Sequence, residues 1–291
     1  MKIFTDAAAN LTPERAAELG IEVVPFQVTF MGKTYRDGID LHPQDLYRMY
    51  AENPEEFAST SQPSAGDFKV AYENSDSDEI LSIHLSSGLS GTYSAAEQAA
   101  QMVTSKAVTV VDTKMVGPAL GWMVELAAHG AKAGWTTARI LEAMEKLKQN
   151  TITMVTFSDI RYLIHSGRVS HLKGIIASVL HLKPVIGMNE EDGRYTTVGQ
   201  EMTVRRAMRK MVEVAHHKFG EQKLRLQLMH GSNLAGVEQL RTAVNGVLDA
   251  VEEKLVPVTL VLGAHAGPTV VGLAAAPQSF FEKIEPTQQV R

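Results

Sequence analysis

The sequence predicts an α/β fold in two domains, with a largely parallel sheet in the N-terminal domain. Apolar strand-like runs alternate with helix-like stretches, and this alternation is typical of α/β layers. The chain has 291 residues, which suits two domains because a domain commonly holds about 100–200 residues. Hydrophobic residues make up 44% of the chain and charged residues 21%. The chain can therefore bury a sizeable core and is not expected to be disordered.

The first half opens with a short strand at Lys2–Thr5. Thr12 followed by Pro13 predicts a helix start, because threonine is a good N-cap and proline is favoured at the first helical position. β-Branched and aromatic side chains predict one strand over Ile21–Phe30, and apolar residues at helical spacing predict a helix over Thr137–Gln149. The other elements expected here are helices at Pro43–Tyr50, Ala65–Tyr72, Thr92–Val103 and Val116–Ala133, and strands at Glu79–Leu85 and Ala107–Val111.

The second half begins near residues 151–157 without an obvious linker. We place the domain boundary near residue 158, which gives an N-terminal domain of residues 1–158 and a C-terminal domain of residues 159–291. A turn at Glu190–Gly193 separates two of its strands. The elements expected here are helices at Ser170–Leu180, Thr203–Phe219 and Leu234–Leu248, and strands at Lys183–Met188, Arg194–Thr197, Leu224–His230, Val256–Leu262 and Val270–Ala275.

Composition excludes several functional classes. The chain has no cysteine, so disulfides, thiolate metal sites and cysteine nucleophiles are ruled out, and a reducing cytoplasm is the expected location. The net charge is −5, so there is no basic footprint for nucleic acid. The histidines have no recognisable metal-ligand spacing, and we expect neither a metal nor a cofactor.

One uncharged run, from Leu255 to Phe281, is long enough to span a bilayer. It is interrupted by three prolines, three glycines and His265. Two short buried strands joined by a Gly/Pro loop explain this composition better than a membrane span.

The first motif that could bind a ligand is Thr60-Ser61-Gln62-Pro63-Ser64. Ser64 with Asp67 fits a capping box at the start of the next helix, so a structural role is favoured for Ser64. Thr60 and Ser61 precede the cap, and their hydroxyls are suitable donors for an anionic head group.

The second motif, Ser86 to Tyr93, follows a strand and leads into a helix. Ligands of parallel α/β sheets bind beyond the carboxyl ends of the strands, where helix N-termini attract anions. Gly88 and Gly91 would let the backbone approach a carboxylate or phosphate closely. The segment lacks both the dinucleotide-binding fingerprint and the P-loop lysine, so nucleotide binding is weakly supported. It also lacks the first glycine of a hydrolase elbow around Ser90.

The third motif, Gly263-Ala264-His265-Ala266-Gly267-Pro268, places His265 at the end of an expected strand in a glycine loop. Its small neighbours leave the ring room to meet a ligand, where histidine could donate a hydrogen bond or shuttle a proton. Arg168 lies at a glycine turn and Arg205 at a helix start. An arginine in either place can bind an anion bidentately. A solvated helix face is favoured for Arg206, Arg209 and Lys210.

Together these motifs resemble the DegV family of bacterial fatty-acid-binding proteins. The set occurs in family order over nearly the whole chain. Two loop positions depart from the family pattern, namely Ala7 after Asp6 and Thr269 after Gly-Pro. The matching pieces are Thr60-Ser61-Gln62-Pro63-Ser64, Leu85-Ser86-Ser87, Leu89-Ser90-Gly91-Thr92-Tyr93, Val111-Asp112-Thr113, Gly167-Arg168-Val169-Ser170 and Gly263-x-His265-x-Gly267-Pro268.

The resemblance implies a two-domain protein with one long-chain fatty acid between the domains. It implies that the hydroxyls of Thr60 and Ser90 hold the carboxylate, and that a separate ATP-dependent fatty-acid kinase subunit converts this carboxylate to an acyl phosphate. The expected ligand-binding set is Thr60, Ser61, Ser90, Gly91, Thr92 and His265, and the residues expected to assist phosphotransfer are His265, Arg205 and Arg168.

On this view the chain is a lipid-binding subunit without its own catalytic residues, in transient contact with a membrane surface at most. The alternative from another class is a stand-alone serine esterase that uses Ser90 and His265.

Overall fold

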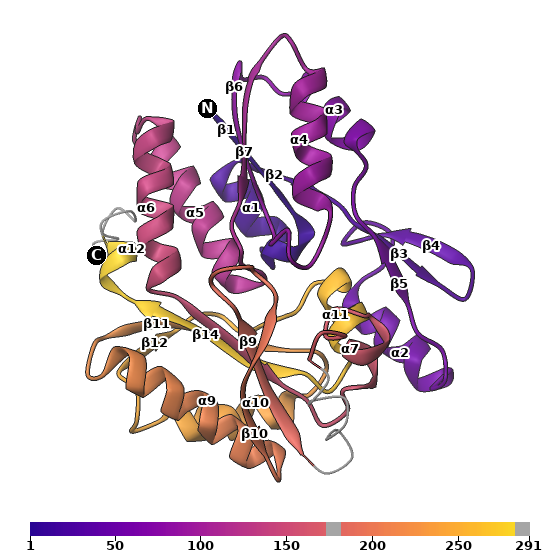
Figure 1. Ribbon diagram of the computed structural model, residues 1–291, viewed down its shortest axis with the longest axis vertical. Coiled ribbons are helices and arrows are strands. Elements are labelled where there is room, and N and C mark those ends of the chain that lie inside the picture. Colours follow the sequence, from indigo (N-terminus) through magenta and orange to yellow (C-terminus); the bar gives the residue numbers. More distant parts are fainter. Residues whose placement is uncertain (173–181, 283–291) are drawn as a thin grey trace.

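The computed structural model describes residues 1–172 and 182–282, which form two large sheets and one small sheet with helices packed around them (Figure 1). The expected helix at Ser170–Leu180 lies almost wholly outside the described residues. The helices that are described are α1 Pro13–Leu19, α2 Pro43–Glu52, α3 Ala65–Glu73, α4 Thr92–Met102, α5 Pro118–Lys132, α6 Thr137–Gln149, α7 Arg161–His165, α9 Val204–Phe219, α10 Leu234–Val244, α11 Leu260–Ala266 and α12 Ser279–Glu282, with a 3-10 turn η1 at Ala7–Ala9.

The N-terminal sheet is parallel, as the sequence predicts. Its strands run in the order β2-β1-β6-β7, and every neighbouring pair is parallel. Helices α3 and α4 cover one face, while α5 and α6 lie on the other side (Figure 1). Because the strands are parallel, the loops after β1, β6 and β7 gather at one edge of the sheet. The strand bounds are β1 Lys2–Asp6, β2 Ile21–Val24, β6 Glu79–His84 and β7 Ala107–Asp112.

A small antiparallel sheet holds the first motif. Its strand order is β4-β3-β5, with β3 at Gln27–Phe30, β4 at Lys33–Arg36 and β5 at Ser59–Ser61. The prediction of one strand over Ile21–Phe30 is wrong, because β2 and β3 belong to different sheets. Pro25 lies at the break, where its ring fixes the backbone and it has no N–H to donate to a ladder.

The second sheet is mixed and contains seven strands within the described residues. Its order is β10-β9-β8-β14-β11-β12, and β13 pairs with β11. Helices α9 and α10 cover one face, whereas α5 and α11 lie on the other side, toward the N-terminal sheet (Figure 1). The domain boundary near residue 158 stays a prediction. The strand bounds are β8 Ile152–Thr156, β9 Lys183–Met188, β10 Tyr195–Glu201, β11 Leu224–His230, β12 Ala250–Glu252, β13 Val256–Pro257 and β14 Val271–Pro277.

The expected strand at Val256–Leu262 is also wrong. Only Val256–Pro257 pair as a strand, and the chain then turns into α11. The carboxylate of Asp37 accepts hydrogen bonds from the N–H groups of Leu260 and Val261. This long-range cap satisfies the helix N-terminus and stabilises a helix that local β-propensity does not predict. His265 therefore lies in the last turn of a helix and not in a glycine loop. Among the described helices, none is long and apolar enough to cross a membrane.

Candidate functional site

The first and third motifs meet at a hydrogen bond between Thr60 and His265. Thr60 lies on β5 opposite Val28 of β3, and α11 packs against this small sheet. The Thr60 hydroxyl oxygen is 2.8 Å from Nε2 of His265. Residues 205 positions apart thus form one polar pair between the two halves of the chain.

Close packing against tyrosine rings explains the glycines of the third motif. A Cβ atom on Gly263 would lie 2.4 Å from the hydroxyl oxygen of Tyr47. A Cβ atom on Gly267 would lie 2.2 Å from the ring of Tyr162, and Gly267 has a positive φ of 74°. These glycines let the rings of Tyr47 and Tyr162 hold α11, and with it His265, in place.

The second motif forms the turn between β6 and α4. The Ser90 hydroxyl lies 2.9 Å from that of Thr92, which is buried. Gly91 is the N-cap of α4, and a Cβ atom there would lie 2.5 Å from the side-chain nitrogen of Gln62. The first two motifs therefore pack directly against each other.

Thr60, Gln62 and Ser90 line a small chamber of about 40 Å³, called the polar chamber because its wall combines several hydrogen-bonding side chains with mostly apolar ones. Four of the predicted site residues meet there, namely Thr60, Ser90, Arg168 and His265, together with Gln62 of the first motif. Their hydroxyl, amide, imidazole and guanidinium groups are suitable donors for a carboxylate. The chamber thus collects groups from all three motifs and from the glycine turn.

Other predicted site residues lie outside this chamber. Ser61 is exposed, and side chains of adjacent strand residues point to opposite faces. Gly91 and Thr92 shape the turn that holds Ser90 but do not line the chamber. Arg205 lies exposed in the first turn of α9 and lines neither this chamber nor the apolar pocket beside it.

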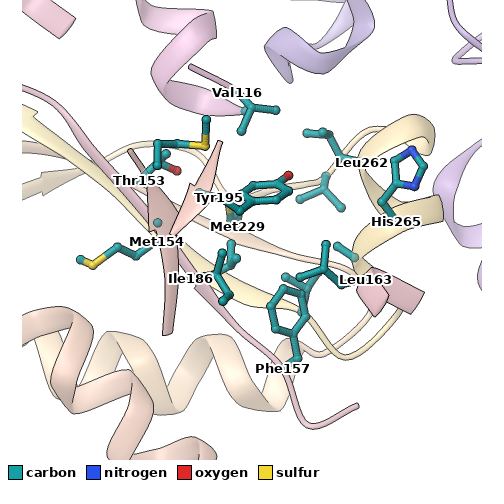
Figure 2. A pocket seen from close by; sticks show the side chains of 17 residues that line it. Val116, Thr153, Met154, Phe157, Leu163, Ile186, Tyr195, Met229, Leu262 and His265 are labelled. Carbon is teal, nitrogen blue, oxygen red and sulfur yellow. The ribbon is translucent and has the colours of Figure 1, made fainter. Parts of the chain in front are cut away.

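The apolar pocket adjoins the chamber and has a volume of about 70 Å³. It lies between the second sheet, α11 and the start of α5, and it shares four residues with the chamber. Figure 2 shows the ring of Tyr195 among apolar side chains, with His265 at one end of the group. The four shared residues are Val116, Tyr195, Leu262 and His265.

Sequence reasoning missed Tyr195, although it lines both spaces. Aromatic side chains are common in strands, so no local signal distinguishes Tyr195 from a core residue. Burial raises the pKa of Tyr195 to about 12, which keeps its hydroxyl protonated near neutral pH. Tyr195 can therefore present a donor at the junction between polar and apolar surfaces.

His265 is held in its neutral form. Burial is the main cause that lowers the pKa of His265 to about 3, and the positive charge of Arg168 acts in the same direction. A neutral imidazole donates from one nitrogen and accepts at the other, so it suits both a hydroxyl and an anionic ligand. Arg168 itself is held by a 2.6 Å hydrogen bond from its guanidinium to the carbonyl of Ser166.

The structure does not join Ser90 and His265, the expected nucleophile and base of a serine esterase, by a hydrogen bond. His265 contacts the hydroxyl of Thr60, whereas the hydroxyl of Ser90 contacts Thr92. A serine esterase needs a direct nucleophile–base contact. In the described parts of the chain no group of three or more acidic, histidine or cysteine side chains could hold a metal.

A hydrogen-bonded Ser-His-Asp network, separate from Ser90 and His265, lies inside the N-terminal sheet. Asp6 contacts Nδ1 of His84 at 2.9 Å, and Nε2 of His84 contacts the hydroxyl of Ser82 at 2.7 Å. All three residues are fully buried, and Ser82 also accepts a hydrogen bond from Tyr72. This network therefore satisfies buried polar groups and is inaccessible to a substrate.

Comparison with known proteins gives consistent matches over nearly the whole chain. A family model described as an uncharacterised protein of the DegV family matches residues 1–278. A DegV domain-containing protein of Staphylococcus aureus is 32% identical over 274 residues, which are 93% of this chain and 96% of that protein. A DegV domain-containing protein of Listeria monocytogenes is 29% identical over 278 residues, with the same coverage of 93% and 96%.

The chain also resembles solved structures over most of its length. A fatty-acid-binding DegV family protein from Thermus thermophilus has a TM-score of 0.85 at 28% identity, covering 95% of this chain and 99% of that one. DegV from Bacillus subtilis, described as a fatty acid binding protein, has a TM-score of 0.83 at 25% identity, covering 95% and 98%.

Proposed function

The chain belongs to the DegV family, and from that membership and the site geometry we propose that it binds one long-chain fatty acid. The carboxylate occupies the polar chamber around Thr60, Ser90 and His265, and the tail enters the adjoining apolar pocket. The observation that supports this most directly is the shared wall of the two spaces, where His265 and Tyr195 line both. An amphipathic ligand needs such a junction of polar and apolar surfaces.

The tail supplies most of the binding free energy. A C16 acid has about 14 methylenes, and each contributes roughly 0.8 kcal/mol when buried. The gross gain of about 11 kcal/mol is reduced by the costs of association and ordering. A pocket of about 70 Å³ is smaller than common ligand pockets of about 300–1,000 Å³. Tail binding therefore requires lining side chains to move, and Met154, Met188 and Met229 are adaptable residues for this.

The polar chamber fixes the head group. A buried carboxylate is costly unless donors surround it. The hydroxyls of Thr60 and Ser90 donate to it, the N–H groups at the start of α4 lie nearby at Gly91 and Thr92, and the guanidinium of Arg168 supplies positive charge. Ser61 extends the same hydroxyl-rich strand toward solvent.

The bound carboxylate is the substrate of a separate ATP-dependent fatty-acid kinase. One carboxylate oxygen forms a bond to the γ-phosphorus of ATP, the bond from that phosphorus to the β,γ-bridging oxygen breaks, and ADP leaves. His265 and Arg168 assist beside the head group, while Arg205 belongs to the surface that meets the kinase. The chain itself is the binding subunit, works in the cytoplasm and exchanges its ligand through transient contact with a membrane surface.

Native mass spectrometry of the purified protein tests this function. A retained mass that matches a C14–C18 fatty acid, released on denaturation, is expected. Protein that is consistently empty and takes up neither added palmitate nor added oleate would contradict the proposed function.

A further inference from the structure

A second, more open cavity lies directly beside the polar chamber. Its volume is about 350 Å³, and its lining includes Gly88, Leu89, Gly167, Arg168, His171 and Arg194. Leu89 and Arg168 also line the chamber, so the two spaces share a wall. The chamber and the larger cavity are therefore neighbours on either side of Leu89 and Arg168.

The lining of this cavity is cationic. Among the residues that the structure describes, its lining includes Arg168 and Arg194 and no acidic residue. Within residues 1–172 and 182–282, neither arginine forms a salt bridge, whereas Arg161 and Arg206 nearby in the sequence each pair with an acid. Two unneutralised guanidinium groups facing one space favour an anionic ligand.

Histidine adds a further polar group to the same wall. Nε2 of His171 lies 2.8 Å from the carbonyl oxygen of Tyr195. A carbonyl oxygen only accepts, so Nε2 donates the proton in this contact. This contact ties the side chain of His171 to the residue that follows Arg194, and so joins the two sides of the cavity.

A tight contact between the two halves of the chain positions Arg194. The turn after β9 is held because the Ser86 hydroxyl donates to the carbonyl of Gly193 at 2.7 Å. A Cβ atom on Gly88 would lie 2.5 Å from the carbonyl oxygen of Asp192, and one on Gly193 would lie 2.0 Å from the Ser86 oxygen. The backbone before Arg194 is therefore fixed against the loop that carries Ser90.

We propose that this cavity binds the phosphoryl group of an acyl phosphate, with Arg168 and Arg194 as its two guanidinium ligands. The proposal rests on the proposed function. A chamber of about 40 Å³ accommodates a carboxylate, but the three phosphoryl oxygens of the product need further space. Arginine suits such oxygens because its planar fork binds them bidentately. Arg168 contacts both spaces and stays beside the charge as it increases on phosphorylation.

The test compares two C16 ligands that differ in their head groups. Palmitate carries a carboxylate, and hexadecylphosphonate is a stable mimic of the phosphorylated head. Their affinities are measured at pH 8 by displacement of a fluorescent fatty acid. The wild-type protein should bind hexadecylphosphonate at least as tightly as palmitate. Arg194→Gln should weaken hexadecylphosphonate binding about tenfold and palmitate binding less than twofold. Arg168→Gln should weaken the binding of both ligands.

Arg209→Gln serves as the matched control, because Arg209 is an exposed arginine of α9 that lines neither space. It should change neither affinity, and circular dichroism melting checks that all variants fold. Palmitate binding without hexadecylphosphonate binding, or an equal effect of Arg194→Gln on both ligands, would overturn this inference alone. Failure of the wild-type protein to bind either ligand would overturn the proposed function and this inference with it.

Discussion

Asp37 caps the helix that bears His265: its Oδ2 atom accepts a hydrogen bond of 2.8 Å from the N–H of Val261. Its other oxygen accepts from Leu260 at 3.1 Å, and Asp37 is buried. Burial is the main cause that raises the pKa of Asp37 to about 6, although both N–H contacts lower it. The Asp37 carboxylate, on the β4–α2 loop, thus orients α11. This helix begins at Leu260, five residues before His265, whose imidazole contacts Thr60.

Asp37→Ala should therefore destabilise the protein and weaken fatty-acid binding. Loss of the cap leaves two buried N–H groups without a partner and should cost about 1–3 kcal/mol. Urea unfolding measures the stability, and displacement of a fluorescent fatty acid measures the binding. Asp40→Ala is the control, because Asp40 pairs with Arg36 on the surface and such pairs contribute about 0–1 kcal/mol. Equal effects of the two variants would contradict the capping role.

Asp37 also illustrates what sequence reasoning can and cannot find. Local signals predict the strands and helices of the N-terminal sheet, the Ser64 cap and the turn that holds Ser90, because each depends on neighbouring residues. They do not predict β5, the short strand that carries Thr60. Residues 260–262 are apolar and β-prone, and their helix depends on a carboxylate 223 positions away. Tyr195 was missed for the same reason, because its place between two spaces depends on packing between the halves of the chain.

Thr60→Val combined with Ser90→Ala should leave the fold intact and weaken fatty-acid binding. The change removes two hydroxyl donors near a charged head group, and such hydrogen bonds contribute about 1.5–3 kcal/mol each. Together the two losses amount to about 3–6 kcal/mol, so the expected loss of palmitate affinity is about 100- to 10,000-fold. Ser59→Ala is the matched control, since Ser59 lies exposed on the same strand and lines neither space. Unchanged palmitate affinity in the double variant would refute the head-group assignment.

Gly263 and Tyr47 should be energetically coupled. A Cβ atom on Gly263 would lie 2.4 Å from the Tyr47 hydroxyl, which is buried and has no hydrogen-bond partner among the residues that the structure describes. Gly263→Ala should therefore destabilise the protein by about 1–3 kcal/mol, and Tyr47→Phe should relieve much of that loss. A double-mutant cycle measured by urea unfolding gives the coupling free energy. If the effects of the two substitutions on the free energy of unfolding are strictly additive, the added methyl group at position 263 is accommodated without Tyr47, and the coupling is refuted.

His265 should make stability fall as the solution is acidified. The pKa of His265 is lowered to about 3 in the folded protein, chiefly by burial, whereas an unfolded chain has a histidine pKa of about 6.5. Between these values the unfolded chain binds a proton that the folded protein does not bind. The contribution of neutral His265 is therefore fully present above pH 6.5 and is lost progressively as pH falls toward 3.

The measurement compares urea unfolding at pH 7.5 and pH 5.5 for wild-type protein and His265→Gln. The wild-type protein should lose about 1 kcal/mol more than the variant over this interval. His217→Gln is the control, because His217 is exposed on α9, and it should follow the wild-type pH dependence. If His265→Gln loses stability as steeply as wild type, His265 already takes up its proton in the folded state. The assignment of a neutral His265 side chain in the folded protein would then be wrong.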